Sequence, residues 1–141
     1  MSEYLVERIK AVGHPNVSAR HKTTLEVTRD NYLTPTGDCI VAINADRCFH
    51  DFAPGFLDLL RSDGSRIEIL IECNDVRDKV IARGDKTLTL GHGSEMVVRK
   101  SSYVCGRTLA VKADKAASDL SRELVTELRK GDRVTVELRV Y

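Results

Sequence analysis

Apolar and polar side chains alternate along several short stretches of the chain, and this alternation predicts strands. The clearest case is 67–71, where Ile67, Ile69 and Ile71 occupy every second position. In such a strand one face is buried and the other is not. The same reasoning predicts strands at 6–12, 23–28, 39–43, 79–82, 95–99, 108–112 and 133–140, with shorter ones at 17–19 and 87–90.

Two other stretches place their apolar side chains at helical spacing. Residues 54–60 begin with a proline, which favours the first position of a helix, and carry an apolar side. Residues 120–128 repeat leucine at every fourth position, and Ser121 is the expected N-cap. Turn-forming residues between the strands at 23–28 and 39–43 predict that these two strands form a hairpin with a long loop.

The second half of the chain repeats the order of the first half. A shift of 71 residues aligns the early strands, and a shift of 68 aligns the later strand, helix and strand. The coinciding pairs include Ala11/Ala82, Gly13/Gly84, His21/His92, Asp46/Asp114 and Arg61/Arg129. The sequence therefore predicts an internal duplication, with repeat 1 at about 5–73 and repeat 2 at about 76–141.

These elements predict a strand-rich α+β fold in a single domain, 1–141, with one main helix per repeat. Neither repeat is long enough to form a comfortable core alone. We therefore expect the repeats to pack about a pseudo-two-fold axis into a closed or nearly closed β-barrel-like fold with the helices outside. The strand–helix–strand order also resembles the repeat unit of cradle-loop barrels, of the double-psi and riboflavin-synthase-like types. That resemblance concerns the fold and implies no activity.

Several segments together resemble a known family over nearly the whole chain. They are 13–17 (GHPNV), 21–28 (HKTTLEVT), 33–40 (LTPTGDCI), 99–103 (RKSSY) and 113–117 (ADKAA). The chain is similar in these segments to an archaeal family known as domain of unknown function 371. The resemblance implies an archaeal, cytosolic protein, and it brings no assigned activity, substrate or cofactor.

Composition narrows the classes of function only slightly. The 22 basic and 21 acidic residues give a formal net charge of +1, so bulk charge does not favour a nucleic acid or an anionic membrane as partner. No apolar run is long enough to span a membrane, and the first eight residues do not have the pattern of a signal peptide. The four cysteines include no Cys-x-x-Cys pair, which favours a reduced, cytoplasmic protein.

We place the candidate site at positions where the two repeats carry different residues. Positions with matching residues are explained more simply by a structural role that both repeats share. Polar residues of the predicted hairpins, one in each half of the chain, satisfy this argument together with one matched histidine and could bind a phosphate. The candidates are His14, Asn16, His21, Lys22, Thr23, Asp38, Lys100, Ser101 and Arg107. The predicted function is the binding of a small anionic or phosphorylated ligand between the repeats.

Simpler interpretations remain open for each of these features. The candidates could form ordinary turns and a solvated basic loop at 99–107, or that loop could serve a nucleic-acid or ribonucleoprotein accessory module. A structural or assembly protein without a ligand is a further alternative. Cys39 is a conceivable nucleophile, although alternation places it on a core face, and Asp46 and Asp114 are expected to cap the next helical turns. We predict no metal site, while the cofactor, catalysis and oligomeric state stay undetermined.

Overall fold

The computed structural model describes residues 3–141. Met1 and Ser2 are part of the predicted domain 1–141 but lie outside the described residues. In this part of the chain eight strands, two α-helices and two 3-10 turns follow one another. Their order is β1 (Leu5–Val12), β2 (Thr24–Thr28), β3 (Ile40–Ala42), η1 (Phe49–Asp51), α1 (Pro54–Leu60), β4 (Arg66–Cys73), β5 (Val76–Arg83), β6 (Glu95–Arg99), β7 (Thr108–Ala110), η2 (Ala117–Asp119), α2 (Arg122–Leu128) and β8 (Arg133–Val140).

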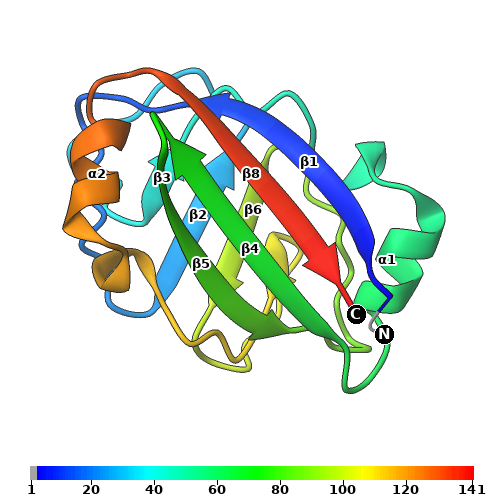
Figure 1. The fold of residues 1–141 in the computed structure, drawn as a ribbon. Coiled ribbons are helices and arrows are strands. Elements are labelled where there is room, and N and C mark those ends of the chain that lie inside the picture. Colours follow the sequence, from blue (N-terminus) through cyan, green and yellow to red (C-terminus); the bar gives the residue numbers. More distant parts are fainter. Residues whose placement is uncertain (1–2) are drawn as a thin grey trace.

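The strands form two four-stranded sheets with the orders β1-β8-β4-β5 and β3-β2-β6-β7. Figure 1 shows the first sheet crossing in front of the second, with α1 and α2 at opposite ends of the molecule. Helix α1 packs on β1 and β8, whereas α2 packs on β4 and β5. The predicted strand-rich α+β class is confirmed.

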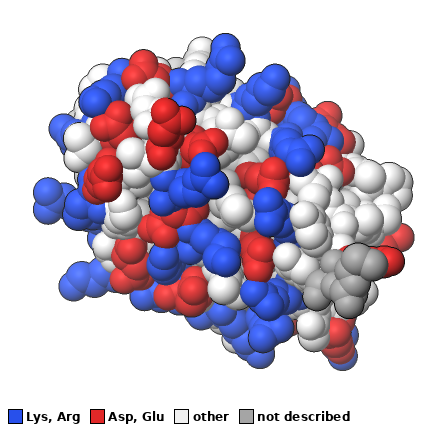
Figure 2. All heavy atoms as spheres, in the orientation of Figure 1, with Lys and Arg blue, Asp and Glu red and all other residues white. Residues whose placement is uncertain are grey.

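The core lies between the two sheets, because each sheet turns its apolar positions toward the other. Ile9, Ile69 and Val136 come from the first sheet, and Leu25 and Met96 come from the second. All five side chains are buried, which follows from the alternation of period two in these strands. The outer face of the first sheet carries charged side chains of both signs, and Figure 2 shows them intermixed on this side of the molecule.

A two-residue turn joins the first half of the chain to the second. Asn74 and Asp75 have positive φ values of 50° and 66°, and they connect β4 to β5 with Cys73 opposite Val76. Two consecutive residues with positive φ are typical of the type I′ turn, whose twist matches that of an antiparallel hairpin. The connection between the segments predicted as repeats, 5–73 and 76–141, is therefore a tight hairpin and not a flexible linker.

The predicted strands at 17–19 and 87–90 are wrong. Each segment contains a residue with positive φ, 49° in the first and 51° in the second, which interrupts an extended strand. Guanidinium groups take the place of a neighbouring strand as hydrogen-bond partners. Arg129 donates to a carbonyl of the first segment and Arg61 to carbonyls of the second. Burial of the apolar residues there reflects packing under a loop.

The predicted hairpin between β2 and β3 is also wrong, because these two strands run parallel. The antiparallel neighbour of β2 is β6, so strands from the two halves lie side by side at the centre of this sheet. Within residues 3–141 no closed barrel is found. The two sheets meet at their edges only through single bridges, Val12–Ile43 and Arg83–Val111.

Close backbone approaches hold each helix against the opposite half of the chain. A Cβ atom on Gly13 would lie 1.9 Å from the carbonyl oxygen of Leu128 at the end of α2. A Cβ atom on Gly84 would lie 2.0 Å from the carbonyl oxygen of Leu60 at the end of α1. Only glycine permits such contacts. Glycine is therefore required directly after β1, where the chain passes the end of α2, and directly after β5, where it passes the end of α1.

Asp46 and Asp114 close the two edges of the first sheet. We expected them to cap the following turns, but Asp46 Oδ1 accepts from the Lys10 backbone N–H and Asp114 Oδ1 from that of Ile81, both at 2.9 Å. These bonds satisfy donors of the edge strands β1 and β5, which would otherwise be free to pair with another chain. The turns themselves are capped by Asp51 and Asp119.

Candidate functional site

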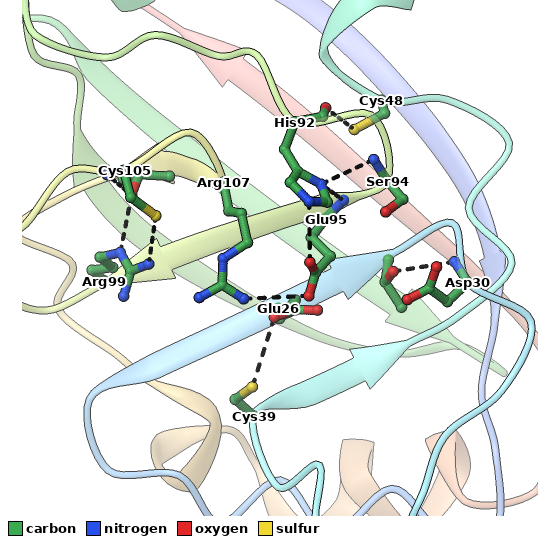
Figure 3. A network of polar contacts seen from close by, with 12 residues as sticks. Glu26, Asp30, Cys39, Cys48, His92, Ser94, Glu95, Arg99, Cys105 and Arg107 are labelled. Carbon is green, nitrogen blue, oxygen red and sulfur yellow. Dashed lines mark hydrogen bonds and ion pairs between the residues drawn. The ribbon is translucent and has the colours of Figure 1, made fainter.

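Polar side chains gather on the outer face of the β3-β2-β6-β7 sheet (Figure 3). In β2, Leu25 and Val27 line the core, so Glu26 between them points to the opposite face. Side chains from β6 and from the loop before β7 approach Glu26 on that face (Figure 3). We define the outer-face cluster as Glu26, Cys39, Glu95, Arg99, Cys105, Arg107 and Thr108.

Glu26 is a buried acid, with only 3% of its surface exposed. Its Oε1 lies 3.9 Å from the thiol of Cys39, while Oε2 meets no donor among residues 3–141 if the carboxyl is ionised. Burial, together with the hydrogen bond to Glu95 and the negative charge of Glu95, raises the pKa of Glu26 to about 8. A proton on Glu26 resolves both problems, because it neutralises the buried group and supplies a donor toward Glu95.

Glu95 is held in place by cationic and polar neighbours. Its Oε1 accepts from Arg107 Nη1 at 3.3 Å, and its Oε2 lies 3.3 Å from His92 Nε2. The other ring nitrogen of His92 accepts from the backbone N–H groups of Ser94 and Glu95. His92 Nδ1 therefore carries no proton, and Nε2–H is the donor toward Glu95.

Cys105 lies at the cationic side of the cluster. Its sulfur accepts from Arg99 Nη2 at 3.3 Å and from the Thr108 hydroxyl at 3.8 Å. Burial alone would raise the pKa of Cys105, but the Arg107 backbone N–H, the Thr108 hydroxyl and the two guanidinium groups outweigh it and lower the pKa to about 7. Near neutral pH about half of this thiol is ionised.

Arg107 interacts with both the acid pair and the thiol: its guanidinium donates to Glu95, and its positive charge is attracted by Cys105. Those interactions raise the pKa of Arg107 above its ordinary value. The side chain remains 43% exposed. Arg99 is partly exposed, and the ring of Tyr103 lies over its guanidinium, with 5.0 Å between the guanidinium carbon and the ring centre. With five N–H donors on each guanidinium, both arginines keep donors for a further acceptor.

The two thiols of the cluster have opposite character. Burial and the neighbouring Glu26 carboxyl raise the pKa of Cys39 to about 11, so Cys39 stays a neutral thiol at physiological pH. The core face that alternation predicted for Cys39 is wrong, because its thiol lies beside Glu26 on the outer face and is partly exposed; burial and the Glu26 carboxyl are what make it a poor nucleophile. The structure places the ionisable thiol at Cys105, on the other side of Arg107.

Of the candidates from the sequence, Arg107 belongs to the cluster, and several others gather around the adjacent ends of β2 and β6. The backbone N–H of Lys100 donates to the carbonyl of Thr23, and Lys100 Nζ pairs with Asp119 Oδ2 at 2.7 Å. His21 Nδ1 accepts from the backbone N–H of Thr24 at 3.0 Å. Lys22 is exposed in the same turn. His21 and His92 thus have the same local role, as their match in the sequence indicates.

The remaining candidates are occupied in local turns. His14 Nδ1 accepts from the backbone N–H of Asn16, and Asn16 Nδ2 donates to the carbonyl of Leu33. Asp38 accepts from two backbone N–H groups through its carbonyl, and Ser101 Oγ accepts from the N–H of Tyr103. Among residues 3–141 no side-chain hydrogen bond or ion pair joins these four residues to Arg107.

Sequence reasoning did not select most members of the cluster as site residues, namely Glu26, Glu95, Arg99, Cys105 and Thr108. One signal was present, since the repeat alignment opposes Glu26 to Val97 and Thr24 to Glu95. A glutamate between two apolar strand residues was a second signal, because such a residue faces away from the core. The thiol had no comparable signal, since its partners come from β6 and from the residues that follow it.

Two negative observations bear on the class of site. In the described part of the chain, no three histidine, cysteine or acidic side chains are arranged to hold a metal ion. None of the helices in residues 3–141 has the length and apolar character needed to cross a membrane.

Comparison with known proteins gives a family but no reaction. A Methanocaldococcus jannaschii protein described as uncharacterized protein MJ0206 is 47% identical over 132 residues, which cover 94% of this chain and 97% of the relative. The family model described as domain of unknown function (DUF371) matches residues 9–141. The resemblance to this family is confirmed, whereas the looser similarity to cradle-loop barrels is not shown. The chain belongs to the DUF371 family.

Proposed function

We propose that the protein binds a small anionic ligand at the outer-face cluster. The observation that carries the proposal is the pair of guanidinium groups beside Cys105: Arg99 donates to the sulfur, and Arg107, which donates to Glu95, remains 43% exposed and keeps donors for a further acceptor. Planar guanidinium groups match the geometry of carboxylate and phosphate oxygens.

The charge balance of the cluster favours an anion over a cation. With a pKa of about 8, Glu26 is mostly protonated at neutral pH, and the other acid of the cluster, Glu95, already accepts from Arg107 and His92. The two arginines therefore exceed Glu95 by one charge while Cys105 is a thiol, and they balance Glu95 and the thiolate when Cys105 is ionised, so that the unused guanidinium donors then supply the attraction for an anion. An arriving anion gains attraction there without first displacing a carboxylate from Arg99.

We also propose that the chain is internally duplicated and that this ligand binds between the repeats. Matched contacts support the duplication, since Glu7 pairs with Arg47 and accepts from the N–H before α1, while Asp78 pairs with Lys115 and accepts from the N–H before α2. The cluster combines residues of both repeats across the β2–β6 pair. The four free cysteines fit the cytoplasmic location that we propose with it.

The proposal is tested by titrating the protein with inorganic phosphate and following backbone amide shifts by NMR. We expect saturable shifts at residues 105–108, with a dissociation constant of about 1 mM, corresponding to about −4 kcal/mol. Arg107→Gln should weaken binding by about 10- to 100-fold, because a charge-assisted hydrogen bond contributes about 1.5–3 kcal/mol. Arg133→Gln, which removes an exposed arginine at the start of β8, is the matched control. Equal affinities for both variants would contradict the proposal.

The nucleic-acid alternative makes a different prediction. It requires the basic residues of 99–107 to be available, yet Arg99 and Arg107 are in the cluster and Lys100 pairs with Asp119. Retention of RNA that falls steeply with salt concentration, and that Lys100→Ala weakens as much as Arg107→Gln, would favour this alternative.

A further inference from the structure

We propose that Cys105 is a nucleophile that attacks an electrophilic carbon in a small anion held by Arg99 and Arg107. The inference rests on the proposed function for the ligand's charge. The substrate class is a carboxylate or phosphate whose reactive carbon lies close to its anionic group, because the guanidinium donors and the sulfur share one side of the cluster.

The sulfur is held in a defined position by its neighbours. Thr108, which is completely buried, donates its hydroxyl to Cys105 Sγ. The same hydroxyl oxygen accepts from Arg99 Nε and from the Cys105 backbone N–H, each at 3.0 Å. The thiol therefore lies in a network of donors that stabilises the thiolate and limits rotation of the side chain. Cys105 is also partly exposed, whereas Cys48 and Cys73 are each only 1% exposed.

A second observation points to chemistry in the same cluster. Glu26 is almost completely buried, and when ionised its Oε2 has no donor among residues 3–141. Ionisation of an acid in this position destabilises the fold. The repeat alignment places Val97, which cannot ionise, opposite Glu26. Arg107 donates to Glu95 of this acid pair, and its charge also acts on Cys105. Titratable groups with strongly altered environments occur preferentially at functional sites.

The proposed step balances without an oxidant, a reductant or a metal. A lone pair of the Cys105 thiolate forms a sulfur–carbon bond, and the bond from that carbon to its leaving group breaks. The leaving group departs with the electron pair of the broken bond. Iodoacetate and iodoacetamide both react in this way with release of iodide, and they differ at the carboxylate or amide beside the reactive carbon.

The first experiment measures nucleophilicity alone with neutral iodoacetamide and peptide mapping by mass spectrometry. The thiolate fractions at pH 7 follow from pKa values of about 7 for Cys105 and about 11 for Cys39. After correction for the greater intrinsic reactivity of the more basic thiolate, Cys105 should react roughly 50- to 100-fold faster than Cys39. Its rate should be half-maximal near pH 7. A rate that rises only above about pH 8.5, as for an ordinary thiol, or faster labelling of another cysteine, would overturn the inference.

The second experiment separates this inference from the proposed anion site by comparing iodoacetate with iodoacetamide. We expect the folded protein to favour iodoacetate severalfold more than the urea-unfolded chain does, and Arg107→Gln to remove most of that preference. Fast labelling by iodoacetamide with no preference for iodoacetate would refute the anion site while supporting the nucleophile. The alkylation rate is also measured in Arg133→Gln as a control. An equal loss of the preference in that variant would show that the effect comes from a general loss of charge or of folding and not from Arg107.

Discussion

Replacing Glu26 by glutamine tests whether this buried acid holds its proton at neutral pH. Glutamine has the same shape, can donate to Glu95 and cannot ionise. In the unfolded chain Glu26 ionises with its ordinary pKa of 4.5, while in the folded protein its pKa is about 8. Between these values the folded state binds the extra proton, so the free energy of unfolding of the natural protein falls as pH rises. The amide of the Glu26→Gln variant contributes no such slope.

The size of the effect follows from the two pKa values. At about 1.4 kcal/mol for each pH unit, the interval from 4.5 to about 8 corresponds to at most about 5 kcal/mol. Water at the exposed rim of the cluster and the charge of Arg107 screen the ionised form. We therefore expect Glu26→Gln to gain about 2–3 kcal/mol relative to the natural protein between pH 5 and pH 9.

The assay is urea denaturation followed by far-ultraviolet circular dichroism at pH 5, 7 and 9. Glu123→Gln, which changes an exposed glutamate on α2 to the same amide, gives the baseline for removing one carboxyl. We expect the stability difference between Glu26→Gln and the natural protein to move in favour of the variant as pH rises. A difference that stays constant across this range, or moves the other way, would refute the reasoning that Glu26 is protonated in the fold.

Four further substitutions test the scaffold and the location of the site. In the same urea experiment, Gly13→Ala should lower the free energy of unfolding by about 2–3 kcal/mol, because the new Cβ meets the Leu128 carbonyl oxygen. Gly55→Ala is its control: Gly55 lies in α1 with open space around the position of a Cβ, so this change should raise the free energy of unfolding by up to about 1 kcal/mol. Asp114→Ala should lower the free energy of unfolding by about 1 kcal/mol, because it leaves the Ile81 backbone N–H of the edge strand β5 without its acceptor. The freed donor should also increase concentration-dependent association, measured by light scattering. Lys100→Ala should leave the phosphate titration unchanged, and a tenfold loss of affinity would instead place the ligand beside Asp119.

The strands were predictable because alternation reports directly which face of a strand is buried. The predicted strand at 133–140 coincides with β8, and the one at 95–99 coincides with β6. Alternation does not report the partner of a strand. The parallel pairing of β2 with β3 depends on the path of the connecting loop and on β6 taking the antiparallel position, and neither is encoded in the strand itself.

The site was predictable only where its residues differ between the two halves. Arg107 opposes Cys39 in the repeat alignment, and it lies in the cluster. His14 also differs from its counterpart, yet its imidazole serves a local turn with Asn16. A difference between the halves therefore marks a position free to vary, and only its three-dimensional neighbours decide whether it takes part in a site.

On the internal duplication that we propose, the acid and the thiol of the cluster are departures from a scaffold that both halves share. Contacts that determine the fold, such as those of Gly13 and Gly84 with the helix ends, occur in both halves. The cluster is asymmetric, because Glu26 opposes a valine and Arg107 a cysteine in the repeat alignment. A buried acid with a raised pKa lowers stability at neutral pH, and valine would avoid that cost. The asymmetry is therefore unfavourable for stability alone, and the binding and chemistry that we propose at Cys105 would account for it.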